Sequence, residues 1–197
     1  KMENVNVVIW GLGVVGGGMA KMLLDKKGVK ITGAIKKRAE GCGKDLGAVL
    51  DLGREVGTIV SNDAEAVFKS AGSNILLHAT GSFVTEIEEE ILLAVKHGYN
   101  VVSIAEEMAY PWCADKAASE RIDKAAKEAG VTVFGTGINP GFVLDLLIIS
   151  MTGVCRSVNS ISAQRVNDLA AFGPTVMRTQ GVGTTVEQFK EGVASGD

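Results

Sequence analysis

The feature that most constrains the fold lies near the start of the chain, where a largely apolar run leads into a glycine-rich turn and a helical pattern. The run covers residues 5–10 and predicts a buried strand, whereas the apolar residues of 19–24 recur at helical spacing. Between them stands Gly11-Leu12-Gly13-Val14-Val15-Gly16, which fits the pattern G-x-G-x-x-G. In this context the glycines permit a tight turn, a close approach of pyrophosphate to the backbone, and close packing of helix on strand. The sequence therefore predicts a dinucleotide-binding turn, and the alternative is a glycine-rich turn without a ligand.

Strand and helix patterns continue to alternate through the first two thirds of the chain. Further strands are expected at residues 30–35, 59–60, 75–78, 101–104 and 131–134, with helices at 84–97 and 115–129 among those between them. Gly98 and Gly130 follow these two helices as C-terminal stops. Such alternation predicts an α/β fold, a Rossmann doubly wound parallel sheet with helices on both faces.

The pattern changes after Gly135, and we place a domain boundary close behind it. Residues 1–140 are expected to form the Rossmann domain, and residues 141–197 the start of a second α+β domain for substrate binding or dimerisation. Its expected elements are a helix at 142–151, a half-buried strand at 158–166 and an incipient helix at 184–192. So short a domain cannot easily bury its own sheet face. We therefore expect a truncated chain and a homodimer in which the incomplete sheet is paired.

Composition and spacing exclude several other classes of protein. The net charge of −3 offers no general polycation for nucleic acid or an anionic membrane. No apolar run reaches the ~18 residues of a membrane span, and no signal peptide precedes the first strand, so a cytoplasmic protein is expected. Cys42, Cys113 and Cys155 are expected to be free thiols, and neither they nor His78 and His97 have the spacing of metal ligands. No metal is expected.

Three consecutive cations, Lys36-Lys37-Arg38, follow the second expected strand. An NAD-binding turn usually has Asp or Glu at this place, about twenty residues after the glycines, to accept hydrogen bonds from the adenosine ribose. Cations there can instead neutralise a 2′-phosphate, so the expected cofactor is NADP or NAD, with NADP favoured. The alternative is a solvated charge run in a loop.

The fourth expected strand ends in His78-Ala79-Thr80-Gly81-Ser82. Small residues at this strand end let a cofactor pass over it, so Ala79, Thr80 and Gly81 are predicted to contact the cofactor. Thr80 and Ser82 can donate hydrogen bonds to the cofactor or, alternatively, cap the following helix. His78 is interpreted as a satisfied core or crevice histidine, with catalysis as the alternative.

Two adjacent carboxylates, Glu106 and Glu107, follow the fifth expected strand at the same edge of the sheet. Neighbouring side chains on an irregular loop usually point in different directions, so one can face the site while the other faces solvent or caps backbone. A carboxylate there can pin a substrate ammonium and accept its proton before hydride leaves the carbon. Both are therefore candidate catalytic bases, and ordinary surface glutamates are the alternative.

Four motifs together resemble a known family. They are Val8-Ile9-Trp10-Gly11, His78-Ala79-Thr80-Gly81, the run 105–112 and the run 137–145. The chain resembles the 2,4-diaminopentanoate dehydrogenases, which have an N-terminal domain like that of dihydrodipicolinate reductase and are related to native amine dehydrogenases. The resemblance covers essentially the whole chain. It implies an NAD(P)-dependent oxidoreductase acting on CH–NH2 donors, which deaminates 2,4-diaminopentanoate to 2-amino-4-oxopentanoate and ammonia in ornithine breakdown.

The resemblance also implies roles for single residues. In related amine dehydrogenases a glutamate at the end of this strand binds the reacting amine or imine, which carries over to Glu106, our preference, or to Glu107. Asn139 and Pro140 correspond to a crossover loop near the nicotinamide and are assigned to cofactor or substrate contact, with a rigid turn as the alternative. The chain departs from the family pattern at Lys36, where the family has Asp, and in being shorter than family members.

Two other functions are compatible with the same N-terminal architecture. One is a reductase of a cyclic imine or semialdehyde, although such chemistry more often recruits Lys or His, whereas an ammonium substrate needs an anionic partner. The other is a non-enzymatic sensor that binds NADP and signals through partner contact, because Rossmann domains serve many roles. Replacing Glu106 and Glu107 separates them, since a sensor keeps its cofactor response.

Overall fold

The computed structural model describes residues 5–171, 177–178 and 180–195. By its internal packing the chain divides into two compact units, residues 1–156 and residues 157–197. Within the described ranges, no helix combines the length and hydropathy that a membrane span requires.

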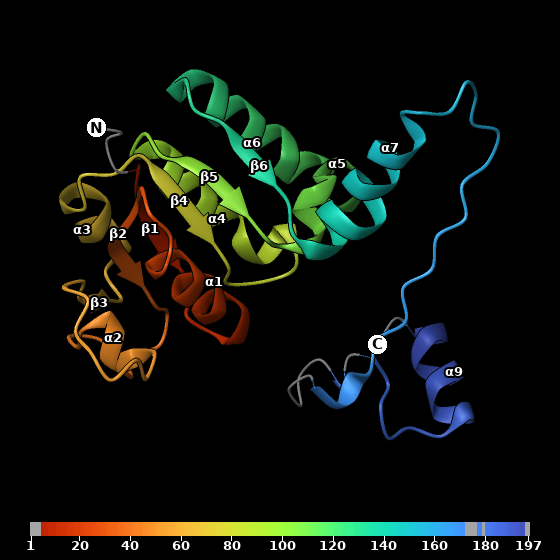
Figure 1. Ribbon diagram of the computed structural model, residues 1–197, viewed down its shortest axis with the longest axis horizontal. Helices are drawn as coiled ribbons and strands as arrows, with labels where there is room; N and C mark the ends of the chain where they lie inside the picture. The colour runs from red at the N-terminus through yellow and green to blue at the C-terminus, as the bar shows by residue number, and fades with distance from the viewer. Residues whose placement is uncertain (1–4, 172–176, 179, 196–197) are drawn as a thin grey trace. The chain divides into compact units, whose positions relative to one another are not determined.

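The first unit is built on a six-stranded sheet in which every neighbouring pair of strands is parallel (Figure 1). The strands are β1 (Val5–Trp10), β2 (Val29–Ile35), β3 (Val60–Ser61), β4 (Ile75–His78), β5 (Asn100–Ser103) and β6 (Val133–Gly135). Their spatial order is β3-β2-β1-β4-β5-β6, so the direction of winding reverses between β1 and β4. This is the order of a doubly wound Rossmann sheet, and the predicted fold class is confirmed.

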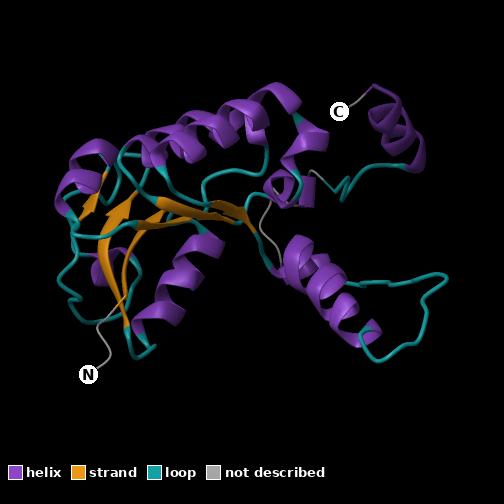
Figure 2. Cartoon of the chain, turned by 90° about the horizontal axis from the view of Figure 1, so that it is seen from above, coloured by secondary structure: helices purple, strands orange, loops and turns teal. Residues whose placement is uncertain are grey.

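Helices cover both faces of this sheet (Figure 2). They are α1 (Val14–Leu24), α2 (Leu46–Val49), α3 (Ala64–Ser70), α4 (Val84–Lys96), α5 (Pro111–Ala114) and α6 (Lys116–Ala129). Side chains of α1 and α2 pack in one apolar cluster, and those of α3, α4 and α6 pack in a second cluster. The short 3-10 helix η1 (Glu106–Ala109) follows β5.

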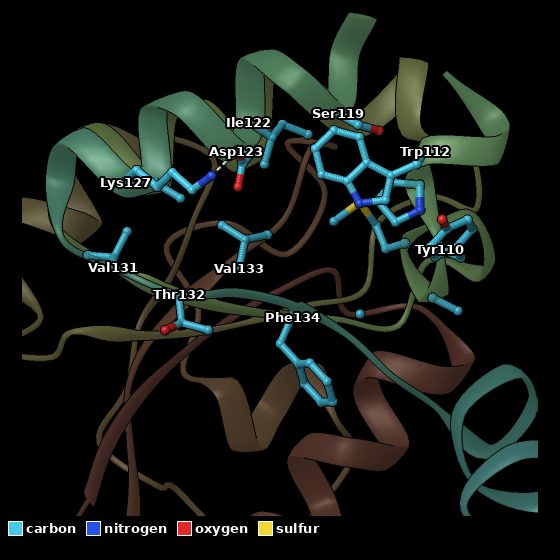
Figure 3. A pocket seen from close by; sticks show the side chains of 15 residues that line it. Tyr110, Trp112, Ser119, Ile122, Asp123, Lys127, Val131, Thr132, Val133 and Phe134 are labelled. Carbon is cyan, nitrogen blue, oxygen red and sulfur yellow. Dashed lines mark hydrogen bonds and ion pairs between the residues drawn. The ribbon is translucent and has the colours of Figure 1, made fainter. Parts of the chain in front are cut away.

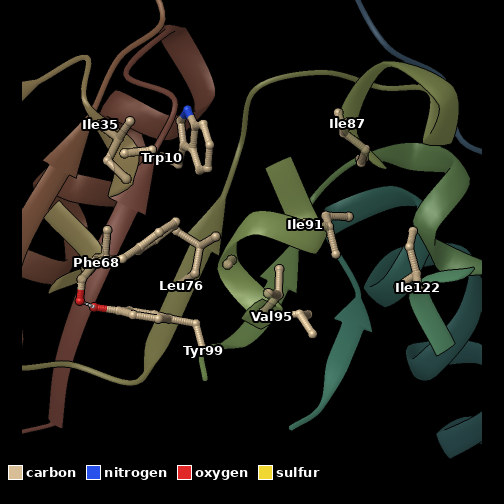
Figure 4. Close-up of a cluster of buried hydrophobic side chains, with 14 of the residues drawn as sticks. Trp10, Ile35, Phe68, Leu76, Ile87, Ile91, Val95, Tyr99 and Ile122 are labelled. Atoms are coloured by element: carbon tan, nitrogen blue, oxygen red, sulfur yellow. Dashed lines mark hydrogen bonds between the residues drawn. The ribbon is translucent and has the colours of Figure 1, made fainter. Parts of the chain in front are cut away.

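Local sequence explains the bounds of the long helices. The Asp115 side chain accepts a hydrogen bond from the Ala118 amide at the start of α6, and Gly130 ends that helix with a left-handed φ of 66°. Helix α4 buries Ile87 and Ile91 completely against the sheet (Figure 4). Because buried aliphatic side chains at i and i+4 share one face, the 3.6-residue period fixes how α4 lies on the strands.

The segment after β6 begins with a non-helical turn. Segment η2 (Ile138–Leu146) opens with extended backbone at Asn139 and Pro140 and a φ of 126° at Gly141, and it then continues as a helix into α7 (Leu147–Thr152). The helix expected at 142–151 is thus present, and it belongs to the first packing unit. The predicted boundary between residues 140 and 141 stays a prediction.

One expected element of the second unit is wrong. Residues 158–166 form no strand, although their apolar and polar residues alternate. A strand needs a partner for its backbone N–H and C=O groups, and no described residue pairs with this segment. This unit includes the helices η3 (Leu169–Ala171) and α9 (Val186–Ser195), the latter close to the helix expected at 184–192.

Candidate functional site

Parallel pairing brings the ends of the strands to one edge of the sheet, and with them the predicted site segments. Backbone hydrogen bonds continue past the strand ends, from Gly11 N to Ile35 O (3.0 Å) and from Ala79 N to Trp10 O (2.7 Å). The glycine turn thus lies between the segments that follow β2 and β4. This position is the topological switch point, where ligands of open α/β sheets bind.

The three motif glycines differ in what a side chain would meet. A Cβ on Gly11, whose φ is 100°, would lie 2.2 Å from Ala79 O, and a Cβ on Gly16 would lie 2.0 Å from Gly11 O. Both positions are closed by the protein itself. A Cβ on Gly13, in contrast, would meet no atom within 4 Å from any described residue other than its chain neighbours. The turn therefore leaves open space at Gly13, which is what the approach of a pyrophosphate to the backbone requires.

The open space adjoins the N-terminus of α1. Gly13 is the N-cap and supplies no side-chain hydrogen bond, and the first turn has no acidic residue. Val14 and Val15 are 93% and 61% exposed, so the first turn is accessible from outside. The N–H groups of a first helical turn have no intrahelical acceptors, and the helix dipole favours an anion there. The geometry fits a dinucleotide phosphate.

The three cations after β2 do not have equivalent surroundings. Lys37 Nζ lies 2.5 Å from Glu90 Oε1, and this ion pair joins the loop after β2 to α4. Among the residues that the structure describes, no carboxylate forms an ion pair with Lys36 or Arg38. Of the predicted 2′-phosphate ligands, two are thus unpaired within the described chain and Lys37 is already paired.

A buried polar network lies beneath the strand ends. His78 Nε2 lies 2.8 Å from Glu90 Oε2, and the Thr80 hydroxyl donates to the same oxygen at 2.5 Å. On the other side of the ring, His78 Nδ1 lies 3.1 Å from Ser103 Oγ, which accepts from the Ala105 amide at 3.2 Å. With a proton on Nε2, His78 donates to Glu90 Oε2, and its Nδ1 can accept from the Ser103 hydroxyl.

Glu90 is the charged member of this network, and it is only 7% exposed. Burial raises the pKa of its carboxyl, but hydrogen bonds from His78, Lys37 and Thr80 outweigh burial and hold the pKa below its usual value. Sequence reasoning missed Glu90, which ends a run of three glutamates. The signal that could have found it is its position between Ile87 and Ile91, on the apolar face of the expected helix, where an exposed acid does not belong.

The two candidate catalytic glutamates point to different partners. Glu107 Oε2 accepts a hydrogen bond from the Val84 amide (2.7 Å), at the start of α4, whose N-cap Phe83 supplies no side-chain cap. Glu106 is exposed, and its carboxylate has no hydrogen bond or ion pair among the described residues. The structure thus gives Glu107 a helix-capping role and leaves Glu106 available for a substrate.

The turn that contains Asn139 and Pro140 starts from the same edge of the sheet. The Thr136 amide, just after β6, donates to Ser103 O at 2.9 Å, and the Gly141 amide donates to Asp145 Oδ2 at 2.7 Å. The Asn139 side chain is exposed. Contact of Asn139 and Pro140 with a cofactor or substrate stays a prediction, as does that of Ala79, Thr80 and Gly81.

A pocket of about 420 Å³ lies away from the glycine turn, between α6 and the edge strand β6 (Figure 3). Tyr110, Trp112 and Phe134 contribute aromatic side chains to it, and an Asp123–Lys127 ion pair lies on its α6 side. The pocket contains neither Glu106 nor any residue of the glycine turn. The candidate cofactor crevice is therefore the open edge of the sheet and not this cavity.

The chain is similar in sequence to a known family and to two known dehydrogenases. The family model of the 2,4-diaminopentanoate dehydrogenase C-terminal domain matches residues 142–197. A 2,4-diaminopentanoate dehydrogenase of Acetoanaerobium sticklandii is 46% identical over 201 residues, covering 99% of this chain and 55% of that protein. An amine dehydrogenase of Streptomyces virginiae is 25% identical, covering 85% of this chain and 47% of that protein.

The chain is also similar in structure to solved proteins, among them an amine dehydrogenase. An amine dehydrogenase from Mycobacterium smegmatis has a TM-score of 0.79 and 34% identity, covering 98% of this chain and 56% of that one. GenD2 from gentamicin A biosynthesis, in complex with NAD, has a TM-score of 0.54 and 18% identity, covering 68% of this chain and 35% of that one. The latter likeness concerns the fold alone. The chain spans about half the length of the curated relatives that it matches.

Proposed function

The chain belongs to the 2,4-diaminopentanoate dehydrogenase family, and from this premise we propose that it carries the cofactor site and the catalytic glutamate of an NAD(P)-dependent amine dehydrogenase. The proposed reaction is oxidative deamination of 2,4-diaminopentanoate at its C4 amine. Its products are 2-amino-4-oxopentanoate, ammonia and the reduced cofactor. The observation that carries the proposal is the exposed carboxylate of Glu106, which has no hydrogen bond or ion pair among the described residues and lies at the same sheet edge as the open glycine turn.

The cofactor would be held by the chain's own backbone and cations. The turn from Gly11 to Gly16 and the first turn of α1 would hold the pyrophosphate, because open space and free N–H groups coincide there. Lys36 and Arg38 would face the adenosine ribose, where they favour the 2′-phosphate of NADP over NAD. The nicotinamide ring supplies the acceptor for the hydride that leaves the substrate.

Glu106 would bind the C4 ammonium of the substrate and take one of its protons. The nitrogen then has a free electron pair, which forms the C=N bond as the C4–H bond breaks and its electron pair leaves with the hydrogen. Water adds to the resulting iminium carbon, and ammonia leaves to give the ketone. A carboxylate suits the binding and deprotonation of the amine, because it pairs with an ammonium and accepts a proton.

Glu107 has a different part in this proposal. Its hydrogen bond to the Val84 amide holds η1 against the start of α4 and so fixes the backbone that presents Glu106. The Ala105 amide, bonded to Ser103 Oγ, fixes the same backbone from the other side. Glu106 is thus presented by a loop whose neighbours are anchored on both sides, which limits its positional freedom relative to the strand ends.

The test is turnover in Glu106 variants of the purified protein. Formation of reduced nicotinamide is followed with 2,4-diaminopentanoate and either NADP or NAD, and cofactor binding is measured separately by calorimetry. We expect E106Q to lower kcat by roughly 10²- to 10⁴-fold, the usual contribution of a general base, with an unchanged cofactor Kd. The matched control E89Q removes another exposed carboxylate, from α4, and should leave both values unchanged.

The outcomes separate this proposal from the alternatives. Full turnover by E106Q would refute the assignment of the base. Cofactor binding by the wild type without turnover of the diamine would count against the proposed reaction for this chain and would point to truncation, another substrate or a sensor. Turnover of a cyclic imine or semialdehyde alone would support the reductase. No cofactor binding would refute the central proposal.

A further inference from the structure

The Glu90 carboxylate connects three loops at the sheet edge, although it lies on α4 and not at a strand end. Its Oε1 pairs with Lys37 from the loop after β2, and its Oε2 accepts from Thr80 in the loop after β4. Through His78 and Ser103 the hydrogen bonds continue to Ala105, next to Glu106. The network therefore extends from the proposed adenosine end of the site to the proposed catalytic loop.

The ion pair with Glu90 changes the charge that a cofactor would meet. The Lys37 side chain is 59% exposed, whereas that of Glu90 is 9% exposed. A buried carboxylate that loses its cation is left uncompensated in a medium of low dielectric constant, which is strongly unfavourable. Lys37 is therefore held by Glu90, and a 2′-phosphate would have to compete for it.

We infer that Glu90 is a specificity-determining residue of the cofactor site, which withholds Lys37 from a ribose 2′-phosphate and leaves Lys36 and Arg38 to bind it. The inference rests on the proposed nicotinamide cofactor and deepens it. It gives the three cations after β2 unequal roles, although their sequence suggests equal ones. The Lys37–Glu90 pair is electrically neutral, so this part of the site tolerates NAD as well as NADP.

The first test compares how the protein discriminates between the two cofactors with and without the Glu90 charge. Dissociation constants of NADP and NAD, and of the adenosine halves 2′,5′-ADP and 5′-AMP, are measured by calorimetry on the wild type and E90Q. Glutamine has nearly the same shape as glutamate and keeps an acceptor for Thr80 and His78. We expect E90Q to shift discrimination toward the 2′-phosphate by roughly three- to tenfold, as for one unit charge near a partly exposed site.

Matched variants show whether E90Q acts by releasing Lys37 from its ion pair or only by removing a negative charge. E89Q makes the same charge change at an exposed position of the same helix, and we expect less than about a twofold shift because exposed charges are screened. In the wild-type background, K37Q should weaken 2′-phosphate binding less than K36Q and R38Q do, and each of these two should weaken it by roughly three- to tenfold. In the E90Q background, K37Q should become as costly as K36Q.

The outcomes are distinguishable. Equal costs of K37Q in the two backgrounds, or unchanged discrimination in a folded E90Q, would overturn the inference while leaving the proposed function intact. If E90Q does not fold, the K37Q, K36Q and R38Q comparison decides, because equal costs of all three would overturn the inference. Absence of NAD and NADP binding by the folded wild type would overturn the proposed function and this inference together.

Discussion

For the glycine turn we predict that one substitution, Gly13→Ala, weakens cofactor binding and leaves the stability of the protein almost unchanged. Gly13→Ala adds a methyl group where, apart from the adjoining residues, no atom of the described chain lies within 4 Å. Its backbone conformation of φ −74° and ψ −164° is one that alanine adopts freely. The substitution reduces the entropy of the unfolded chain, which stabilises, and weakens the N-cap, which destabilises. We expect the free energy of unfolding to change by less than about 0.5 kcal/mol, because these two effects are of similar size.

Cofactor binding should respond quite differently to Gly13→Ala. A methyl group that moves the pyrophosphate about 1 Å outward lengthens N–H···O distances beyond the range of a hydrogen bond. Each hydrogen bond to a charged group is worth about 1.5–3 kcal/mol, so losing one weakens binding by roughly ten- to hundredfold. Calorimetric titration with NADP and NAD measures this loss, and urea unfolding measures stability.

Two other glycines of the same segment serve as controls. Gly18→Ala lies inside α1 and, apart from the adjoining backbone of that helix, meets no atom of the described residues within 4 Å. It should therefore stabilise by about 0.5–1 kcal/mol and leave the cofactor Kd unchanged. Gly11→Ala forces a Cβ to 2.2 Å from Ala79 O and should destabilise by at least about 2 kcal/mol. If Gly13→Ala bound cofactor as tightly as the wild type, the assignment of the open space to a pyrophosphate would be wrong.

Three further predictions concern structure away from the glycine turn. Glu107→Ala should destabilise by about 1 kcal/mol through loss of the cap on α4, whereas Glu106→Ala should not; equal unfolding midpoints would contradict the capping role. Backbone amides of Val56, Gly47 and Gly57 donate hydrogen bonds to the Asp45 carboxylate and hold its pKa below the usual value. The stabilisation that Asp45 contributes is therefore complete above about pH 4 and is lost as the pH falls through the lowered pKa. Asp45→Asn should therefore be less stable at pH 7 and show a weaker acid dependence in unfolding; an unaltered acid limb would contradict this. We also predict a homodimer, and light scattering that gives a monomeric mass at working concentration would refute it.

Local pattern was enough to predict the Rossmann domain. Residues 5–24 contain a strand, a turn and a helix in sequence, and β-branched residues, glycines and a 3.6-residue period each act within a few positions. The stops at Gly98 and Gly130 are equally local, because each glycine adopts a positive φ that ends the preceding helix. The doubly wound sheet then followed from alternation and short connections.

The strand expected at 158–166 shows where local pattern fails. Alternation of apolar and polar residues describes how a strand would present its faces, but it does not supply the second strand that satisfies the backbone. The helices expected in the chain needed no such partner, because a helix forms its hydrogen bonds within itself. Periodicity alone can therefore predict a strand where the described chain has no neighbouring strand to pair with it, as it does at residues 158–166.

The same distinction explains why the charges of the site were harder to predict than its glycines. The motif glycines are recognised by their spacing, whereas the pairing of Lys37 with Glu90 joins residues 53 positions apart across two elements. Three adjacent cations suggest one phosphate-binding unit until the fold shows that a buried carboxylate on the apolar face of α4 already holds one of them. A charged residue inside a helix's apolar face must find a partner, because burying it alone is strongly unfavourable. A glutamate on the apolar face of an expected helix therefore predicts a cation or hydrogen-bond donor near it, and the residues that follow the neighbouring strands are the first candidates.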